Sequence, residues 1–240
     1  MLRSNKRDNN TLRKLNIKRE FIKYALGSCL IELGNTRVIC TASIEKNVPL
    51  FLRNSTEGWL TAEYRMIPCA SEPRIPRDKI SGRNIEIQRL IGRSLRSVIN
   101  LKKIGERTIR IDCDVIEADG GTRTTSIIGS FIALVDCMYK LYRQNELKEV
   151  YITDYLGAVS VGILNKEYIL DLTYQEDSQV TVDMNIVMNG SGDFIEVQGG
   201  AEKGSFSEKD LKMLLALGKE GIENIIELER QIFKDILIGL

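Results

Sequence analysis

Histidine is absent from the 240 residues of this sequence, and its absence excludes several kinds of chemistry. A Ser-His-Asp or Cys-His nucleophile system cannot be built, and no imidazole can serve as a general base or a metal ligand. The cysteines form no C-x-x-C pair, so a thiolate zinc site is not expected; they are Cys29, Cys40, Cys69, Cys113 and Cys137. Catalysis would therefore depend on carboxylates, cations, hydroxyls, thiols or a bound metal ion.

A secretory signal, a proline- or serine-rich linker and a membrane-spanning apolar run are also missing. No apolar run approaches the roughly 20 residues that cross a bilayer. The cysteines are odd in number and mostly lie in apolar runs, as expected for buried thiols in a reducing compartment. With 43% hydrophobic and 28% charged residues, the chain has an ordinary globular composition. We expect a soluble cytoplasmic protein that forms a single domain over residues 1–240.

The charge is nearly balanced overall but unevenly distributed along the chain. The formal net charge is +1, from 34 Lys and Arg against 33 Asp and Glu. Residues 1–23 carry eight basic residues against two acidic ones, and residues 74–110 carry eleven against three. These two segments could form a positive face for a polyanion, or they could be ordinary solvated surface. Composition alone leaves both readings open.

The hydrophobic pattern predicts strands and helices in alternation, which is typical of a mixed α/β domain. Gly34-Asn35 lies between two short apolar runs in 27–42 and predicts a hairpin. Apolar residues at helical spacing over 87–98 have Arg89, Arg93 and Arg96 on the opposite face. Ser207 with Asp210 resembles a helix cap before a C-terminal helix. The remaining predicted elements are a strand over 108–115, a helix through 128–142, and strands over 157–163, 167–172, 179–188 and 194–198.

The segment from Asp119 to Thr125 is the best local candidate for a binding site. Its two glycines, at a strand-to-helix junction, let the backbone approach a ligand closely. The helix start presents unpaired N–H groups, Thr122 adds a hydroxyl, and Arg123 adds a guanidinium, which together suit a phosphate-like anion. No P-loop or G-x-G-x-x-G pattern is present, and a glycine turn with a threonine cap is the alternative. Arg83 could reach the same anion, or it could form a surface ion pair.

Two aspartates, Asp177 and Asp183, form the second candidate site. Six residues of straight strand span roughly 20 Å, which is too far for the two carboxylates to act together. A turn near residues 176–178 would bring them together, and their mutual repulsion would then raise one pKa or favour a hard cation such as Mg²⁺. Without that turn they are ordinary exposed acids.

Five long segments of the chain resemble, in order, the motifs of the ribonuclease PH family of phosphate-dependent 3′ exoribonucleases. They cover much of the sequence and are GWLTAEYRMIP (58–68), GRNIEIQRLIGRSLR (82–96), DCDVIEADGGTRTTSI (112–127), DLTYQEDSQVTVDMNIVMNG (171–190) and IEVQGGAE (195–202).

This resemblance implies an α/β fold of the ribonuclease PH type, with helices packed on mixed sheets and a homo-hexamer built as a trimer of dimers. It implies phosphorolytic trimming of the 3′ end of tRNA precursors, in which inorganic phosphate releases nucleoside diphosphates and Mg²⁺ assists. By the same resemblance, phosphate is bound by Arg83, Gly121, Thr122 and Arg123; the catalytic and metal-binding acids are Asp177 and Asp183; and tRNA is bound by Arg74 and Arg77.

The departures from the family pattern concern substrate handling. Cys69 stands where relatives usually carry a third loop arginine, and the loop before Ser81 is a few residues short. Fewer phosphate contacts predict weaker or differently arranged tRNA binding. Arg65 replaces a usual glycine and would restore a positive charge near the loop, and Gly200 replaces a usual threonine. Two other functions stay open: a catalytically silent RNA-binding ring subunit, and an unrelated phosphate-handling metabolic enzyme.

Overall fold

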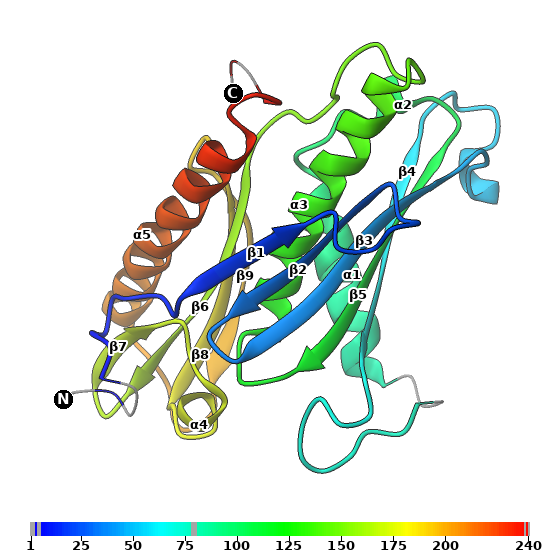
Figure 1. The fold of residues 1–240 in the computed structure, drawn as a ribbon. Helices are drawn as coiled ribbons and strands as arrows, with labels where there is room; N and C mark the ends of the chain where they lie inside the picture. The colour runs from blue at the N-terminus through cyan, green and yellow to red at the C-terminus, as the bar shows by residue number, and fades with distance from the viewer. Residues whose placement is uncertain (1–2, 4–5, 78–80, 238, 240) are drawn as a thin grey trace.

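The fold consists of two β-sheets with helices packed against them (Figure 1). The computed structural model describes residues 3, 6–77, 81–237 and 239. The first sheet has the strand order β1-β2-β3-β5-β4, and only its β4–β5 pair is parallel. Its strands are β1 (Leu15–Arg19), β2 (Gly27–Leu33), β3 (Thr36–Glu45), β4 (Trp59–Met66) and β5 (Thr108–Glu117).

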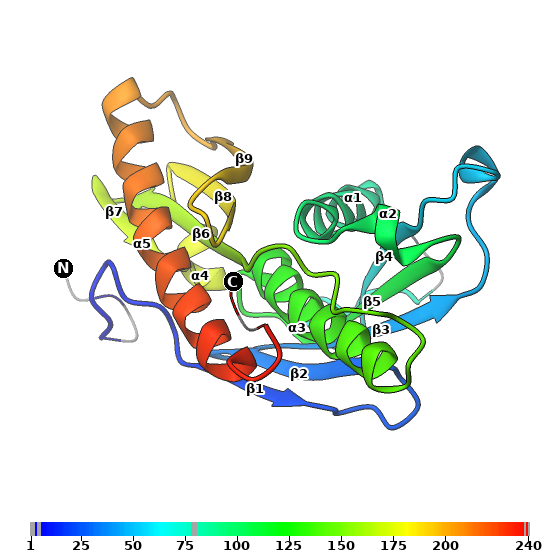
Figure 2. The same ribbon diagram turned by 90° about the horizontal axis from the view of Figure 1, so that it is seen from above.

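The second sheet is antiparallel throughout, with the order β7-β6-β8-β9. Its strands are β6 (Leu156–Leu164), β7 (Glu167–Leu170), β8 (Val182–Asn189) and β9 (Phe194–Ala201). The helices are α1 (Gly82–Arg96), α2 (Leu101–Ile104), α3 (Thr122–Arg143), α4 (Tyr174–Asp177) and α5 (Glu208–Phe233), with a 3₁₀ turn at Leu50–Leu52. Helices α1 and α3 cover one face of the first sheet, and α5 covers the second sheet (Figure 2).

A continuous hydrophobic core extends from the first sheet through α3 to the second sheet and α5. Helix α3 is central because most of its residues are apolar or small and are buried on all sides. Among the described helices, only α3 is long and apolar enough to cross a membrane. The sequence predicted no segment of this kind. Within the 18-residue stretch of α3 that is apolar enough for this, 89% is buried inside the protein, so α3 is here a core helix of the fold.

The structure confirms the mixed α/β class and most of the predicted elements. The hairpin turns at Gly34-Asn35, and α1 buries the expected apolar face. Two strand boundaries differ, and the first lies around residue 180, where β8 begins at Val182 rather than 179 because α4 and a following turn occupy the preceding residues. Likewise β7 ends at Leu170, because Asp171 takes a left-handed conformation with φ of 56°.

Four of the eight basic residues in the N-terminal segment are structural, which corrects both readings of the charge for these four, whereas Lys6, Lys14, Lys18 and Lys23 are exposed. Arg3 and Arg13 are buried, and Arg7 and Arg19 are partly buried. Arg3 donates to Glu176, Arg7 and Arg13 donate to Asp171, and Arg19 donates to Asp136. These four arginines satisfy buried carboxylates and are not a free positive surface. Cys29, Cys40, Cys113 and Cys137 are buried as expected, whereas Cys69 is exposed.

Candidate active site

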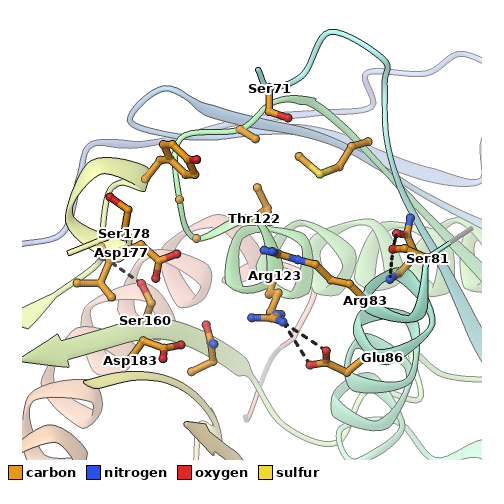
Figure 3. Close-up of a pocket in the computed structure, with 18 of the residues that line it drawn as sticks. Ser71, Ser81, Arg83, Glu86, Thr122, Arg123, Ser160, Asp177, Ser178 and Asp183 are labelled. Atoms are coloured by element: carbon orange, nitrogen blue, oxygen red, sulfur yellow. Dashed lines mark hydrogen bonds and ion pairs between the residues drawn. The ribbon is translucent and has the colours of Figure 1, made fainter. Parts of the chain in front are cut away.

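A cavity of about 1190 Å³ opens between the two sheets, and the predicted site residues line it (Figure 3). Gly121, Thr122 and Arg123 reach it from the N-terminus of α3, and Arg83 reaches it from the first turn of α1. Asp177 comes from α4 and Asp183 from β8. Figure 3 shows the two aspartates on one side of the cavity and the two arginines extending towards them from the other. Residues far apart in the sequence therefore share one site.

The N-terminus of α3 is built to receive an anion. Gly121 precedes the helix in a left-handed conformation (φ 66°, ψ 20°), which a glycine adopts without strain. Among the described residues no side chain caps this helix end, so its first-turn N–H groups are left for a ligand. Helix α1 also begins at the cavity, at Ser81 and Arg83, and its dipole adds to the positive potential.

The Thr122 hydroxyl is held by a residue that the sequence did not single out. Tyr64 on β4 donates its hydroxyl hydrogen to Thr122 Oγ1 over 3.0 Å, and burial raises the pKa of the Tyr64 phenol. A protonated tyrosine that donates to Thr122 leaves the threonine hydroxyl hydrogen free to donate into the cavity. Tyr64 lies within the matched 58–68 segment, but its role depends on strand β4 passing beside α3.

Arg123 is oriented by a chain of side chains from two other elements. Its Nη2 lies 3.4 Å from both carboxylate oxygens of Glu86 on α1, and Glu86 accepts a 2.8 Å hydrogen bond from Gln198 on β9. The Arg123 Nε is buried and has no hydrogen-bond partner among the described residues. A buried N–H donor costs free energy until it is paired. The Nε–H of Arg123 is thus available to donate a hydrogen bond at the place where the sequence predicts a phosphate.

Asp177 and Asp183 approach each other because the chain turns between them. Thr173 and Glu176 form a capping box that starts the single turn of α4, which ends at Asp177. This is the turn near residues 176–178 that the sequence required. The pKa of Asp177 is raised by partial burial and then by the Asp183 carboxylate, while Arg83 and Arg123 lower it. The four side chains therefore interact electrostatically across one cavity.

The donor set fits a divalent cation shared with a substrate. Mg²⁺ is usually bound by one or two carboxylates together with waters and substrate phosphates. Asp177 and Asp183 supply two carboxylates that face the cavity. In the part of the chain that the structure describes, no cluster of three acidic or cysteine side chains could hold a metal by itself. The site thus suits an ion completed by substrate oxygens.

The predicted RNA-binding arginines are placed differently from each other. Arg77 lines the cavity, and its carbonyl accepts a 3.3 Å hydrogen bond from Arg65, which lines the cavity as well. Arg74 is exposed in the same loop but is not part of the cavity wall. Residues 78–80 lie outside the described residues. Arg65 thus places a cation beside the loop.

Two family models match the chain and together span both sheets. Residues 11–139 match domain 1 of the 3′ exoribonuclease family. The chain belongs to the 3′ exoribonuclease family. Residues 154–221 match domain 2 of the same family, so Arg83 and the 121–123 turn come from the first unit and the aspartates from the second. Membership in this family excludes an unrelated metabolic enzyme, and the single domain expected over 1–240 stays a prediction.

Solved exosome structures share the fold of this 3′ exoribonuclease family member. Rice (Oryza sativa) Rrp46 is 20% identical, with a TM-score of 0.79, over 96% of this chain and 99% of that one. A chain of the Archaeoglobus fulgidus exosome with RNA bound to its active site is 21% identical, with a TM-score of 0.81, over 96% and 92%. An archaeal exosome core chain is 20% identical, with a TM-score of 0.76, over 97% and 91%. At these identities the likeness establishes the fold.

Proposed function

We propose that this protein is an active phosphorolytic 3′-to-5′ exoribonuclease. The observation that carries the proposal is the cavity in which two cations and a helix N-terminus face two carboxylates. An inorganic phosphate and an RNA phosphodiester are both anions, so an enzyme that joins them must neutralise charge and position the reactants. The cationic side of this cavity suits the first anion, and the acidic side suits the departing 3′-oxygen.

Inorganic phosphate would be bound by Arg83, Arg123, the Thr122 hydroxyl and the amides at the start of α3. The unpaired Nε of Arg123 gives phosphate a buried donor, and Glu86 holds the same guanidinium in place. Phosphate already carries its nucleophilic oxygen, so the reaction needs no histidine base. The attack is in line on the last phosphodiester: the new P–O bond forms to the inorganic phosphate, the bond to the 3′-oxygen breaks, and a nucleoside diphosphate leaves.

The acidic pair would act on the departing 3′-oxygen. Because its pKa is raised, Asp177 is better suited than a fully solvated aspartate to carry a proton to that oxygen. Asp177 and Asp183 would also hold a Mg²⁺ ion, which would supply charge stabilisation to the transferring phosphoryl group when bound. Either role needs both carboxylates on the same side of the cavity, as Figure 3 shows them.

The substrate that we propose is the 3′ end of a tRNA precursor, bound by the basic loop that includes Arg74 and Arg77. We also propose a homo-hexameric ring of three dimers in the cytoplasm, where the five free cysteines would stay reduced. Cys69 stands where relatives usually carry a loop arginine. We therefore expect the RNA affinity of this protein to fall less steeply with salt concentration than that of its relatives, because fewer phosphate contacts release fewer counterions.

The experiment is a phosphate titration with a short structured RNA that carries a 3′ extension. Nucleoside diphosphates should be released in proportion to bound phosphate. Arg123→Lys should weaken phosphate binding roughly ten- to hundred-fold, as expected from losing charge-assisted hydrogen bonds of about 1.5–3 kcal/mol. The matched control is Arg89→Lys, because Arg89 is exposed on α1 and does not line the cavity.

Two outcomes would contradict the proposal. Release of nucleoside monophosphates without phosphate would mean hydrolysis instead of phosphorolysis. RNA retention and ring assembly with no nucleotide release would mean a catalytically silent subunit, a function consistent with the structural likeness to exosome chains. The presence of all six predicted phosphate-binding and acidic residues on one cavity favours the active enzyme.

A further inference from the structure

The two sides of the cavity are joined by a buried arginine that lies outside it. The phosphate side follows the turn at residues 118–121, and the acidic side follows the segment from Asp171 to α4. Arg13, just before β1, is 6% exposed and contacts both segments. No other described arginine donates to both the 118–121 turn and the Asp171–Leu172 segment.

On the acidic side, Arg13 binds Asp171 in a two-point ion pair. Its Nε lies 2.9 Å from Asp171 Oδ2 and its Nη2 lies 2.7 Å from Oδ1, and the Arg13 backbone N–H donates to Oδ2 over 2.7 Å. Asp171 is 2% exposed and holds a left-handed φ of 56°, which is uncommon for a residue with a side chain. Asp171 starts the segment that leads, six residues later, to Asp177.

On the phosphate side, the same guanidinium holds the turn that begins α3. Nη1 donates to the Asp119 carbonyl, and Nη2 makes a longer contact of 3.3 Å to the Gly120 carbonyl. The turn is also tied directly to α4, because the Tyr174 N–H donates to Asp119 Oδ1 over 3.2 Å. At Gly120 the two backbones come so close that a Cβ would lie 2.4 Å from the Leu172 carbonyl oxygen.

These contacts require the planar fork of an arginine. A guanidinium directs several N–H donors outwards in one plane, so it can satisfy a carboxylate on one edge and carbonyls on another. A lysine could pair with Asp171, but its single ammonium lies at one point and would not bridge to the turn at the same time.

We infer that Arg13 is a positioning residue that fixes the distance between the phosphate-binding turn and the acid-bearing helix. It is not part of the cavity wall, and it acts through Asp119, Gly120 and Asp171. This inference rests on the proposed function, since a fixed distance matters for rate only if the two sides act on the same reaction. A displacement of about 1 Å between reacting groups lowers rates about hundred-fold.

The test is Arg13→Lys, which keeps the charge opposite Asp171 and removes the fork. We expect kcat to fall ten- to hundred-fold, while the KM for phosphate changes less than three-fold, because each side of the cavity stays intact and only their spacing changes. The matched control is Arg19→Lys. Arg19 also forms a bidentate pair with a buried carboxylate, that of Asp136, but its hydrogen bonds reach neither the 118–121 turn nor the Asp171–Leu172 segment.

A second measurement does not depend on activity. Hydrogen–deuterium exchange should become faster together in residues 118–123 and 172–178 of Arg13→Lys, and in neither segment of Arg19→Lys. A purely structural role would lower the melting temperature of both variants alike and leave kcat unchanged when corrected for the folded fraction, and this result would overturn the inference. So would faster exchange in only one segment.

The two hypotheses fail in different ways. If the wild-type protein releases no nucleoside diphosphates, the proposed function fails, and the positioning role in this reaction fails with it even where exchange shows the coupling. If the wild type is active and Arg13→Lys keeps its kcat, only the positioning role is wrong.

Discussion

Replacing Gly120 by alanine tests the closest approach in the site. Gly120 has φ of 74°, and a Cβ there would meet backbone atoms of Leu172, Thr173 and Tyr174 at 2.4, 2.6 and 2.7 Å. The left-handed conformation costs a residue with a Cβ about 1–2 kcal/mol. Forcing an extra carbon into a packed interior costs about 1–3 kcal/mol more. Because the obstructing atoms are backbone, no side-chain rotation can relieve the clash, and we expect a total loss of about 2–5 kcal/mol.

The control variant Gly204→Ala separates the conformational cost of the left-handed backbone from the steric cost of the added carbon. Gly204 has a similar φ of 78°, but no atom lies within 4 Å of a Cβ built there, so only the conformational cost applies. The assay is urea unfolding of both variants, with the denaturant slope compared to verify that the same surface is exposed. Gly120→Ala should be less stable than Gly204→Ala by about 1–3 kcal/mol, or roughly 2–12 °C in melting temperature for a chain of this size. Equal stability would refute the close approach of the turn and α4.

Three further predictions concern single side chains. Tyr64→Phe should lower the free energy of unfolding by about 0.5–1.5 kcal/mol and weaken phosphate binding in calorimetry, because Thr122 loses its 3.0 Å donor; unchanged values for both would contradict that role. Asp183→Asn should lower the pKa of Asp177 towards its ordinary value in an NMR titration, since Asp183 helps to raise it; an unchanged pKa would mean that the carboxylates do not interact. Burial raises the pKa of Glu229 well above its usual 4.5, so above that pH the unfolded chain releases a proton that the folded protein keeps. Wild-type stability should therefore fall by up to about 1.4 kcal/mol per pH unit relative to Glu229→Gln, and a gap in unfolding free energy that stays constant with pH would exclude this effect.

Local features predicted the pieces of the site well. The strand-to-helix junction around Gly120 and the arginine-bearing helix α1 both form where periodicity and glycine placement indicated. These features depend on neighbours in the sequence, through backbone sterics and the burial of one helix face. The resemblance to a known family then selected eight residues: the six predicted phosphate-binding and acidic residues and Arg77 line one cavity, whereas Arg74 does not. Their individual roles stay predictions.

Spacing alone could not decide whether the two aspartates meet. The capping box at Thr173 and Glu176 has a sequence signature, but a single helical turn is too short to be recognised reliably from it. The N-terminal charges were harder still. Arg3 and Arg13 have the pattern of an exposed basic tail, and only the carboxylates about 160–170 residues later in the chain make them buried ion-pair partners.

The sequence by itself determined the fold class, most of the elements and the chemical limits of a chain without histidine, because these follow from composition and from short-range periodicity. Only the tertiary structure decided which groups act together. Glu86 and Gln198 orient Arg123, Tyr64 supports Thr122, and Arg13 joins the two sides of the cavity. Each of these contacts joins segments whose separation is set by sheet packing across the whole core, and no local pattern of residues records that distance.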